Sequence, residues 1–249
     1  MATAVVTGAS SGLGREIASL LAARGERVVA VARSRQALDE LATSSPRIEA
    51  IAADLSNPGE RSRIVDAVGD VDILVNNAGL GAAGLVVEAP ADVTNAMVAV
   101  NVAALTDLTA RWLPAMVAHR SGRVLNVAST AAFQPGPRMA VYFATKAYVL
   151  SLTEALAEEL RGTGVSATAF CPGVFASGFQ EVAGIESSRL VRGRSMPTSR
   201  DMALAAISAM DRGAVVAVPG TFNKLGAFAP RLAPRSLVRR MVARVQSDM

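Results

Sequence analysis

Tyr142 and Lys146 are the two residues whose types and spacing most directly suggest chemistry. They lie four positions apart in a helix-like stretch, which places both side chains on one face of the helix. A tyrosine with a pKa near 10 exchanges protons at neutral pH only when a nearby cation stabilises its phenolate. A lysine one helical turn away supplies such a cation. Ser129 ends a strand-like run upstream, where its hydroxyl could hold a substrate oxygen that gains negative charge.

Each of these residues also has an ordinary structural explanation. Tyr-x-x-x-Lys occurs on many helices with the tyrosine half-buried and the lysine in solvent, and a serine at a strand end is commonly a helix cap. The elements that surround these residues therefore decide between catalysis and a purely structural role.

A glycine-rich segment, Thr7-Gly8-Ala9-Ser10-Ser11-Gly12-Leu13-Gly14, follows the first strand-like run and leads into a helical pattern. A phosphate needs backbone N–H donors at the start of a helix, and glycine lets the backbone pass close to it. Strand, turn and helix in this order indicate nucleotide binding more strongly than the glycines alone. The alternative is a tight turn between strand and helix that binds nothing.

Short β-rich runs alternate with helical patterns along the whole chain. The expected strands are Ala4–Thr7, Arg27–Ala32, Ile48–Ala53, Ile73–Asn76, Gly122–Ser129, Gly164–Phe170 and Ala214–Val218. The expected helices begin near Ser11, Ser34, Pro58, Ala91, Arg138 and Thr198. This alternation predicts an α/β protein with a single-domain Rossmann fold, a doubly wound seven-stranded parallel sheet with helices on both faces.

Composition excludes several other classes of protein. The single Cys rules out an internal disulfide, and one Cys with one His argues against a zinc site. Aromatic residues make up only 4% of the chain, too few for base-stacking platforms, so no nucleic-acid partner is expected. No apolar run reaches the roughly 18–20 residues of a membrane span, and no secretory signal is visible. A cytoplasmic location is the default expectation.

Together these motifs resemble the short-chain dehydrogenase/reductase (SDR) family, in particular its ketoacyl-reductase-like bacterial members. The glycine spacing, the Asn76-Asn77-Ala78-Gly79 segment and the position of Ser129 thirteen residues before Tyr142 carry the resemblance, which covers roughly residues 3–220. It implies a catalytic set of Asn101, Ser129, Tyr142 and Lys146, with Asn101 bracing a water beside the lysine. Apart from this resemblance, an asparagine inside a helix is often simply an exposed polar residue.

The resemblance also implies where a dinucleotide lies. The residues that match the family's cofactor contacts are Gly8, Ser10, Ser11, Gly12, Leu13, Arg33, Ser34, Asp54, Leu55, Asn77, Ala78, Gly79, Tyr142, Lys146, Pro172, Gly173, Val174 and Ser177. Asp54 would bond the adenine amino group, cap a turn, or do both.

The end of the second expected strand bears on cofactor choice. An acid there would hold the ribose 2′-OH of NAD, whereas an arginine can pair with the 2′-phosphate of NADP. Ala32 stands where the acid would be, and Arg33 follows it. NADP(H) is therefore favoured over NAD(H), with a simply solvated Arg33 as the alternative.

Substrate choice in the family lies in the segment after Ser129 and in the loop spanning about residues 174–198. In this chain both segments are largely apolar; their apolar residues are Phe133, Pro135, Pro137, Met139, Phe179, Val182, Ile185, Leu190, Val191 and Met196. A hydrophobic alcohol or ketone is expected. Arg189, Arg192 and Arg194 are expected to be solvated rather than to bind an anionic carrier.

The last residues form a basic extension, 221–249, of the single domain 1–249, whose core spans 2–220. Between residues 224 and 249 six basic residues face one acid, a net +5, while the other 223 residues sum to −1. Five apolar residues follow helical spacing within one arc, and three arginines fall outside it: Leu237, Val238, Met241, Val242 and Val245, then Arg239, Arg240 and Arg244. Packing on the domain or on a neighbouring subunit is favoured over contact with an anionic membrane.

The sequence therefore predicts an NADP(H)-dependent oxidoreductase. It would pass hydride between nicotinamide and a carbonyl or secondary alcohol of a hydrophobic small molecule or acyl substrate, with Tyr142 as acid and base. The alternative is a non-catalytic NADP(H)-binding sensor or scaffold. No metal is expected, and the resemblance implies a homodimer or homotetramer.

Overall fold

The computed structural model describes residues 1–184 and 196–247. Six residues that the sequence analysis assigned to the substrate loop lie outside the described residues: Ile185, Arg189, Leu190, Val191, Arg192 and Arg194. The side chain of Val182 is likewise not described.

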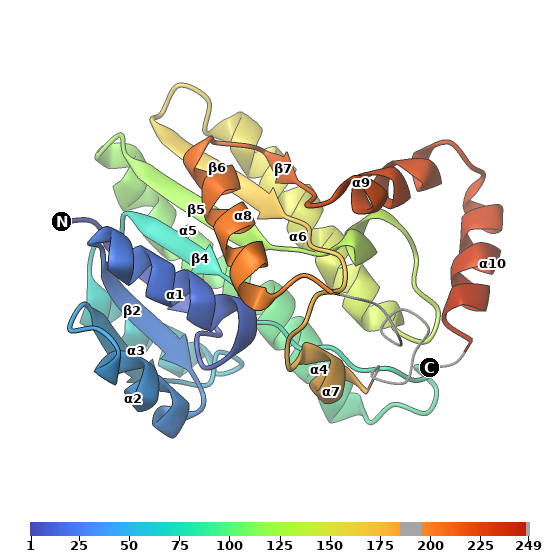
Figure 1. Ribbon diagram of the computed structural model, residues 1–249, viewed down its shortest axis with the longest axis horizontal. Helices are drawn as coiled ribbons and strands as arrows, with labels where there is room; N and C mark the ends of the chain where they lie inside the picture. The colour runs from blue at the N-terminus through green and yellow to red at the C-terminus, as the bar shows by residue number, and fades with distance from the viewer. Residues whose placement is uncertain (185–195, 248–249) are drawn as a thin grey trace.

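Seven parallel strands form one sheet in the order β3-β2-β1-β4-β5-β6-β7 (Figure 1). The strands are β1 (Thr3–Thr7), β2 (Arg27–Ala32), β3 (Ile48–Ala52), β4 (Ile73–Asn76), β5 (Gly122–Val127), β6 (Val165–Phe170) and β7 (Val216–Ala217). The order reverses between β1 and β4, and ligands of doubly wound sheets bind outside the carboxyl ends of the strands at such a point. The predicted fold class and all seven strands are confirmed, with shorter ends at β5 and β7.

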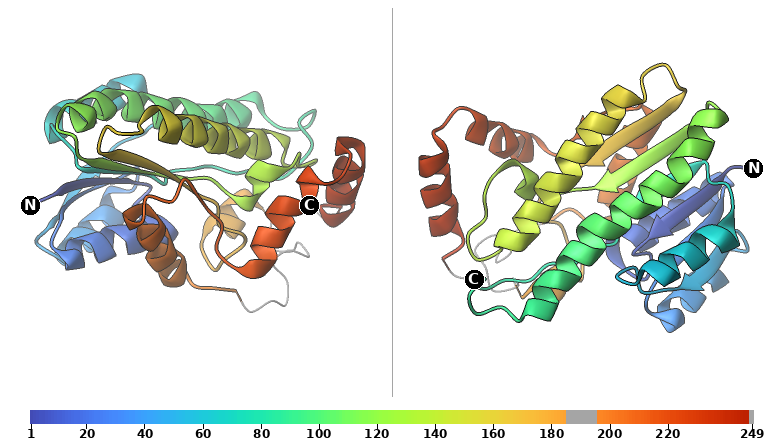
Figure 2. Two further views of the ribbon diagram at one scale, coloured as in Figure 1. Left: turned by 90° about the horizontal axis from the view of Figure 1, so that it is seen from above. Right: turned by 180° about the vertical axis from the view of Figure 1, so that it is seen from behind.

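Helices cover both faces of the sheet (Figure 2). They are α1 (Gly12–Arg24), α2 (Arg35–Thr43), α3 (Pro58–Val68), α4 (Ala91–Val98), α5 (Leu105–Ala118), α6 (Ala140–Glu159), α7 (Phe179–Ala183), α8 (Ser199–Asp211), α9 (Thr221–Phe228) and α10 (Arg235–Val245). A π-helical segment η1 (Ala99–Ala104) joins α4 to α5, and short 3-10 turns η2 (Thr130–Phe133) and η3 (Ala229–Arg231) precede α6 and α10.

The hydrophobic core forms two layers because alternate strand residues point to opposite faces of the sheet. On one face Val6 and Ala30 pack with Ile17 of α1. On the other, Val5 packs in a cluster with Trp112 of α5. Helices α1, α2 and α8 thus cover the first face, and α3, α5 and α6 cover the second.

A buried polar network connects the central strands to the helices below the site. Asn76 Nδ2 donates to Asn126 Oδ1 (2.9 Å) and to Thr109 Oγ1 (3.0 Å). Asn126 Nδ2 in turn donates to Thr153 Oγ1 (2.9 Å). These bonds fix β4 and β5 against α5 and α6, and so fix the strand ends that carry the site.

One helix of the described part of the chain, Ala91–Ala118, has the length and apolar composition of a membrane span. It runs through α4, η1 and α5. Asn101 in its middle is buried and hydrogen-bonded to neighbouring segments, and Leu108 and Trp112 pack on the sheet. These contacts place part of this helix in the core, and 33% of its apolar window is buried.

Candidate active site

The glycine-rich turn between β1 and α1 is held by Asn77. Its Nδ2 donates to Thr7 O (2.9 Å) and Gly8 O (3.2 Å). Gly8 has φ +68°, and a Cβ on it would lie 2.8 Å from the Ala78 Cα, so only glycine fits. A Cβ on Gly14 would collide with the Gly8 carbonyl. Sequence analysis placed Asn77 at the cofactor; in the structure its side chain shapes the turn.

The start of α1 suits a phosphate group. Ser11 precedes the helix in extended conformation and makes no side-chain capping bond, and the first turn contains no acid. The N–H groups of that turn thus keep their donor capacity, at the positive end of the helix dipole. Ser10, Ser11, Gly12 and Leu13 all line the cavity described below.

The ends of β2 and β3 form the next part of the wall. Ser34 Oγ accepts from Ala37 N (3.4 Å) and caps α2. Asp54 Oδ1 accepts from Ser56 N (2.9 Å), which is the turn role the sequence left open. That hydrogen bond lowers the pKa of Asp54, and the nearby charge of Arg33 lowers it further. Arg33 and Asp54 therefore face the same region of the wall.

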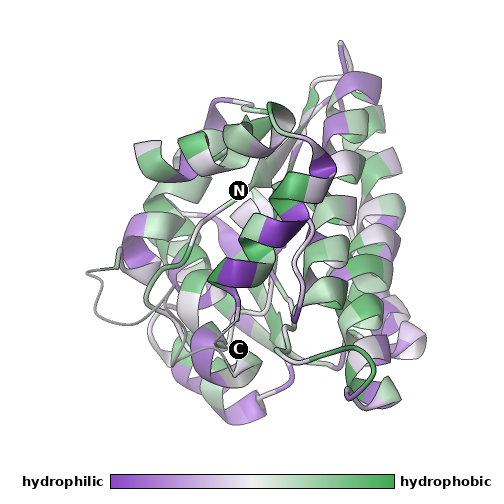
Figure 3. Cartoon of the chain, turned by 90° about the vertical axis from the view of Figure 1, so that its right-hand side faces the viewer, coloured by the Kyte–Doolittle hydropathy of each residue, from purple (hydrophilic) through white to green (hydrophobic). Residues whose placement is uncertain are grey.

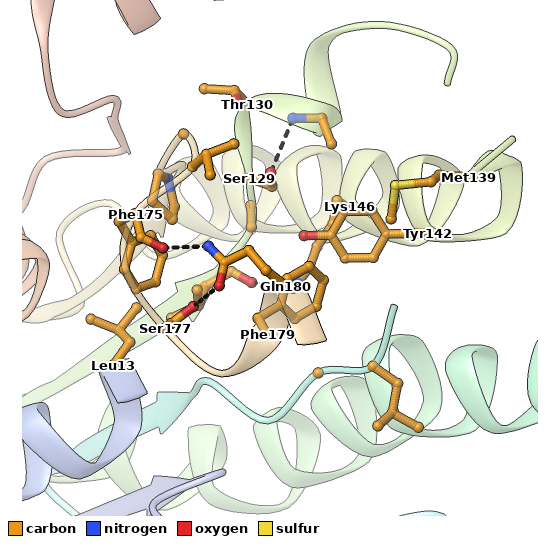
Figure 4. Close-up of a pocket in the computed structure, with 18 of the residues that line it drawn as sticks. Leu13, Ser129, Thr130, Met139, Tyr142, Lys146, Phe175, Ser177, Phe179 and Gln180 are labelled. Atoms are coloured by element: carbon orange, nitrogen blue, oxygen red, sulfur yellow. Dashed lines mark hydrogen bonds between the residues drawn. The ribbon is translucent and has the colours of Figure 1, made fainter. Parts of the chain in front are cut away.

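Tyr142, Ser129 and Lys146 converge beyond the carboxyl ends of β5 and β6 (Figure 4). Burial raises the pKa of Tyr142 to about 12, while its hydrogen bond with Ser129 acts in the opposite direction. Burial lowers the pKa of Lys146 to about 8. Lys146 Nζ donates to Val127 O (2.7 Å) and lies 5.9 Å from the centre of the Tyr142 ring. The site thus places a protonated phenol beside a buried cation.

Asn101 is held in the π-helical segment η1, just behind the cavity wall. Its Nδ2 donates to Leu80 O (2.9 Å) and Thr145 Oγ1 (3.0 Å), and its Oδ1 accepts from Leu80 N (2.8 Å). A Cβ on Gly79 would lie 3.4 Å from Lys146 Nζ and 3.5 Å from Asn101 Oδ1. The glycine therefore leaves a small polar space between the lysine and the asparagine.

The segment after β6 folds over the site. Gln180 Nε2 donates to Phe175 O, and Gln180 Oε1 accepts from Ser177 Oγ (3.1 Å) (Figure 4). The Phe179 ring lies 5.3 Å from the Tyr142 ring and close to Gly81. The hydroxyl of Ser177, expected at the nicotinamide, is thus held by Gln180, and Phe179 covers one side of Tyr142.

A single cavity of about 1430 Å³ connects these parts. Apart from Asn101, every residue that the sequence assigned to catalysis or to the cofactor lines it. The far wall comes from the end of the chain and was not anticipated; its residues include Phe222, Asn223, Val238, Met241, Val242, Val245 and Gln246. Val238 and Val242 pack in the same cluster as Tyr142 and Met139.

Two buried groups near the site have no functional assignment from the sequence. Cys171 is fully buried, and burial raises its thiol pKa to about 12, so it is an inert core residue as expected. Gln246 is a cavity-lining residue that is 2% exposed, and its buried Oε1 finds no hydrogen-bond partner among the described residues. Within residues 1–184 and 196–247, no three His, Cys, Asp or Glu side chains gather as a metal site.

Comparison with known proteins settles the family. The short chain dehydrogenase family model matches residues 2–186. The chain belongs to the short-chain dehydrogenase/reductase family. An uncharacterised oxidoreductase of Staphylococcus epidermidis is 35% identical over 176 residues, 69% of this chain and 76% of that protein.

Solved structures agree over nearly the whole chain. A short-chain dehydrogenase from Sphingobium yanoikuyae in complex with NADPH superposes with a TM-score of 0.84 at 31% identity, covering 95% of both chains. A 3-ketoacyl-(acyl-carrier-protein) reductase from Brucella melitensis complexed with NADH gives a TM-score of 0.79 at 30% identity, covering 88% of this chain and 96% of the other. The chain thus has an oxidoreductase fold with a nucleotide-cofactor site.

Proposed function

We propose that this SDR is an NADP(H)-dependent oxidoreductase that transfers hydride between nicotinamide and a carbonyl or secondary alcohol of a hydrophobic substrate. The observation that carries the proposal is the convergence of Tyr142, Ser129 and Lys146 on one cavity that also begins at the N-terminus of α1. A bound nicotinamide would supply the hydride at the carbonyl carbon. The chain's own residues would supply the proton and hold the oxygen.

Tyr142 is suited to act as the acid in carbonyl reduction. Because burial raises its pKa to about 12, the phenol keeps its proton at neutral pH until a substrate oxygen develops negative charge. Ser129 is close enough to hydrogen-bond that hydroxyl and can donate to the same substrate oxygen. The hydride and the Tyr142 proton together convert the carbonyl to an alcohol, which leaves a phenolate on Tyr142.

Lys146 then stabilises the phenolate and helps to restore its proton. Its ammonium lies next to the Tyr142 ring, and its Nζ borders the polar space beside Gly79. Asn101 Oδ1 borders the same space. A water held there would connect Lys146 to Asn101 and onward to solvent, which supports the role that the family resemblance implied for Asn101.

Arg33 and Ala32 support NADP(H) over NAD(H). No acid ends β2 to repel a phosphate, and Arg33 lines the cavity near Asp54. A guanidinium in that position can pair with a 2′-phosphate through two hydrogen bonds. The Sphingobium relative binds NADPH and the Brucella relative binds NADH, so these residues rather than the fold support the choice.

The cavity walls favour a hydrophobic substrate. Met139, Phe179, Val238 and Val242 make the region next to Tyr142 apolar. Asn223 and Gln246 are polar residues of the far wall, but the Oε1 of Gln246 is itself buried and does not face the cavity. A substrate with an apolar body therefore fits the walls next to Tyr142.

The test is NADPH oxidation with a panel of aliphatic ketones, diketones and β-ketoacyl thioesters. Wild type is compared with Tyr142→Phe, and with Tyr148→Phe as a control, since Tyr148 is the chain's other tyrosine and lies on the outer part of α6. The proposal expects turnover that is lost in Tyr142→Phe, kept in Tyr148→Phe, and weaker with NADH. Tight NADPH binding without turnover on any substrate would instead favour the sensor or scaffold alternative.

A further inference from the structure

The last two helices carry large apolar side chains on the outside of the molecule. Phe222, Leu225 and Phe228 are spaced three apart on α9 and are 75%, 65% and 52% exposed. On α10, Leu237 and Met241 are four apart and are 49% and 56% exposed. This spacing gathers the side chains on one side of each helix. Both helices lie at one end of the fold (Figure 1).

Only part of the apolar face of α10 packs on the domain. Val238 and Val242 are buried in the cluster that contains Tyr142, which confirms that the tail packs on the domain. Leu237, Met241 and Val245 form a second stripe at intervals of four residues, and all three are about half exposed. Met241 and Val245 also border the cavity, whereas Leu237 lies outside both the cavity lining and the buried cluster.

The same helices are strongly basic. Residues 221–247 contain Lys224 and five arginines but no acid. Arg240 and Arg244 follow Leu237 by three and seven residues, so they flank the exposed stripe. Neither pairs with a carboxylate of the described residues, and both are exposed. Figure 3, which faces this end, shows hydrophobic and strongly hydrophilic residues side by side on exposed helices.

We propose that this face binds the anionic surface of a lipid bilayer. We name it the α9–α10 surface and define it by Phe222, Leu225, Phe228, Leu232, Leu237 and Met241 together with Lys224, Arg240 and Arg244. Apolar side chains beside basic ones on exposed helices are the pattern of helices that lie in a membrane interface. The apolar residues enter the headgroup boundary, and the arginines pair with lipid phosphates.

Charge argues for lipid over a second copy of this chain. A symmetric dimer through the α9–α10 surface would bring together two copies of a segment, residues 221–247, that contains basic residues and no acid, so like charges would repel. An anionic bilayer offers the opposite sign over a wide area. The family resemblance implies a subunit contact through the expected helices that begin near Ala91 and Arg138, which are the α4–α5 helix and α6, a different part of the chain.

Docking through this surface would affect how a substrate enters the cavity. Phe222, Met241 and Val245 line the cavity and are also exposed, so they form part of its mouth. A protein docked through this surface would open its cavity toward the acyl chains, and a lipophilic substrate could enter without crossing water. This consequence rests on the proposed function, whereas the docking itself does not.

The test measures co-sedimentation of the full chain with sucrose-loaded vesicles, without cofactor or substrate. Vesicles of phosphatidylcholine alone are compared with an equimolar mixture of phosphatidylcholine and phosphatidylglycerol. The proposal expects binding to the anionic vesicles that weakens strongly between about 25 mM and about 500 mM NaCl. Replacing Lys224, Arg240 and Arg244 with glutamine is expected to lower the partition coefficient on the order of 100-fold.

A matched control distinguishes the role of the α9–α10 surface from the general loss of three positive charges. Arg47, Arg123 and Arg161 are exposed elsewhere, and changing these three to glutamine removes the same charge but should leave binding within about twofold.

A second pair of variants tests the apolar part. Leu225→Gln with Leu237→Gln, outside the cavity lining, should reduce vesicle binding, whereas Val87→Gln with Leu204→Gln, also exposed, should not.

Three outcomes would overturn the proposal. They are equal binding to both kinds of vesicle, absence of binding, and equal losses in the surface variants and their controls. Sedimentation velocity without lipid tests the remaining alternative, which is that the α9–α10 surface is a subunit interface. If Leu225→Gln with Leu237→Gln dissociates an oligomer and vesicles bind no protein, the surface is a subunit interface and the membrane proposal is wrong.

Discussion

Replacing Arg33 with alanine is expected to weaken NADPH binding about tenfold and to leave NADH binding unchanged. Arg33 lies in the cavity wall and makes no ion pair with a carboxylate of the described residues, so its guanidinium is available to a ligand. A hydrogen bond to a charged group contributes about 1.5–3 kcal/mol. Because Arg33 is exposed, solvent and salt reduce this to about 1.4 kcal/mol, which is about tenfold in Kd.

Isothermal titration calorimetry with NADPH and NADH measures the effect. Arg35→Ala is the control, because Arg35 is two residues away and its Nε already pairs with Asp39 at 2.9 Å. Both variants lose one positive charge, so any difference in their NADPH affinity comes from where the arginine lies. The tenfold difference in NADPH affinity between wild type and Arg33→Ala should become smaller as NaCl is added. Equal losses for NADPH and NADH, or equal losses in the two variants, would refute the argument for Arg33.

Two further predictions concern proton transfer and backbone strain. Burial lowers the pKa of Lys146 to about 8, so its ammonium is present at pH 7 and disappears above pH 8; kcat for ketone reduction should fall about tenfold per pH unit there. Gly164 has φ +87°, and a Cβ on it would collide with Arg120 O, so Gly164→Ala should lower the free energy of unfolding in urea by about 3 kcal/mol or more. Gly162→Ala, at φ +75° with no atom within 4 Å, should cost only about 1–2 kcal/mol.

Much of the fold could be predicted because its signals are local. The strands are short Val/Ala blocks, and the turns that follow contain Gly8 and Asn77, whose roles depend on neighbours in sequence and in the adjacent strand. The β5 strand ends at Val127, two residues early, because Ser129 caps the 3-10 turn η2 with its side chain. A serine after an apolar run can either extend the strand or cap the turn that follows it, so the sequence alone does not fix where β5 ends.

The parts that were missed depend on tertiary contacts. The π-helical segment around Asn101 has no distinct hydrophobic period, so its sequence reads as one continuous helix. The Gln180–Ser177 bond joins residues three apart in an irregular loop, and nothing in the sequence pairs them. Residues 221–247 become the far wall only because β6 and β7 carry the chain back to the cavity. Their amphipathic spacing predicted a helix but not which face it would cover.

The most direct test of the account follows deuterium from NADPH labelled at the transferring position of the nicotinamide. Wild-type protein and a ketone that supports turnover are incubated with the labelled cofactor, and the product is analysed by mass spectrometry. The account predicts deuterium on the carbinol carbon with wild type, and a loss of product with Tyr142→Phe even though calorimetry shows that this variant still binds NADPH. Product without deuterium, or wild-type rates in Tyr142→Phe, would contradict hydride transfer assisted by Tyr142.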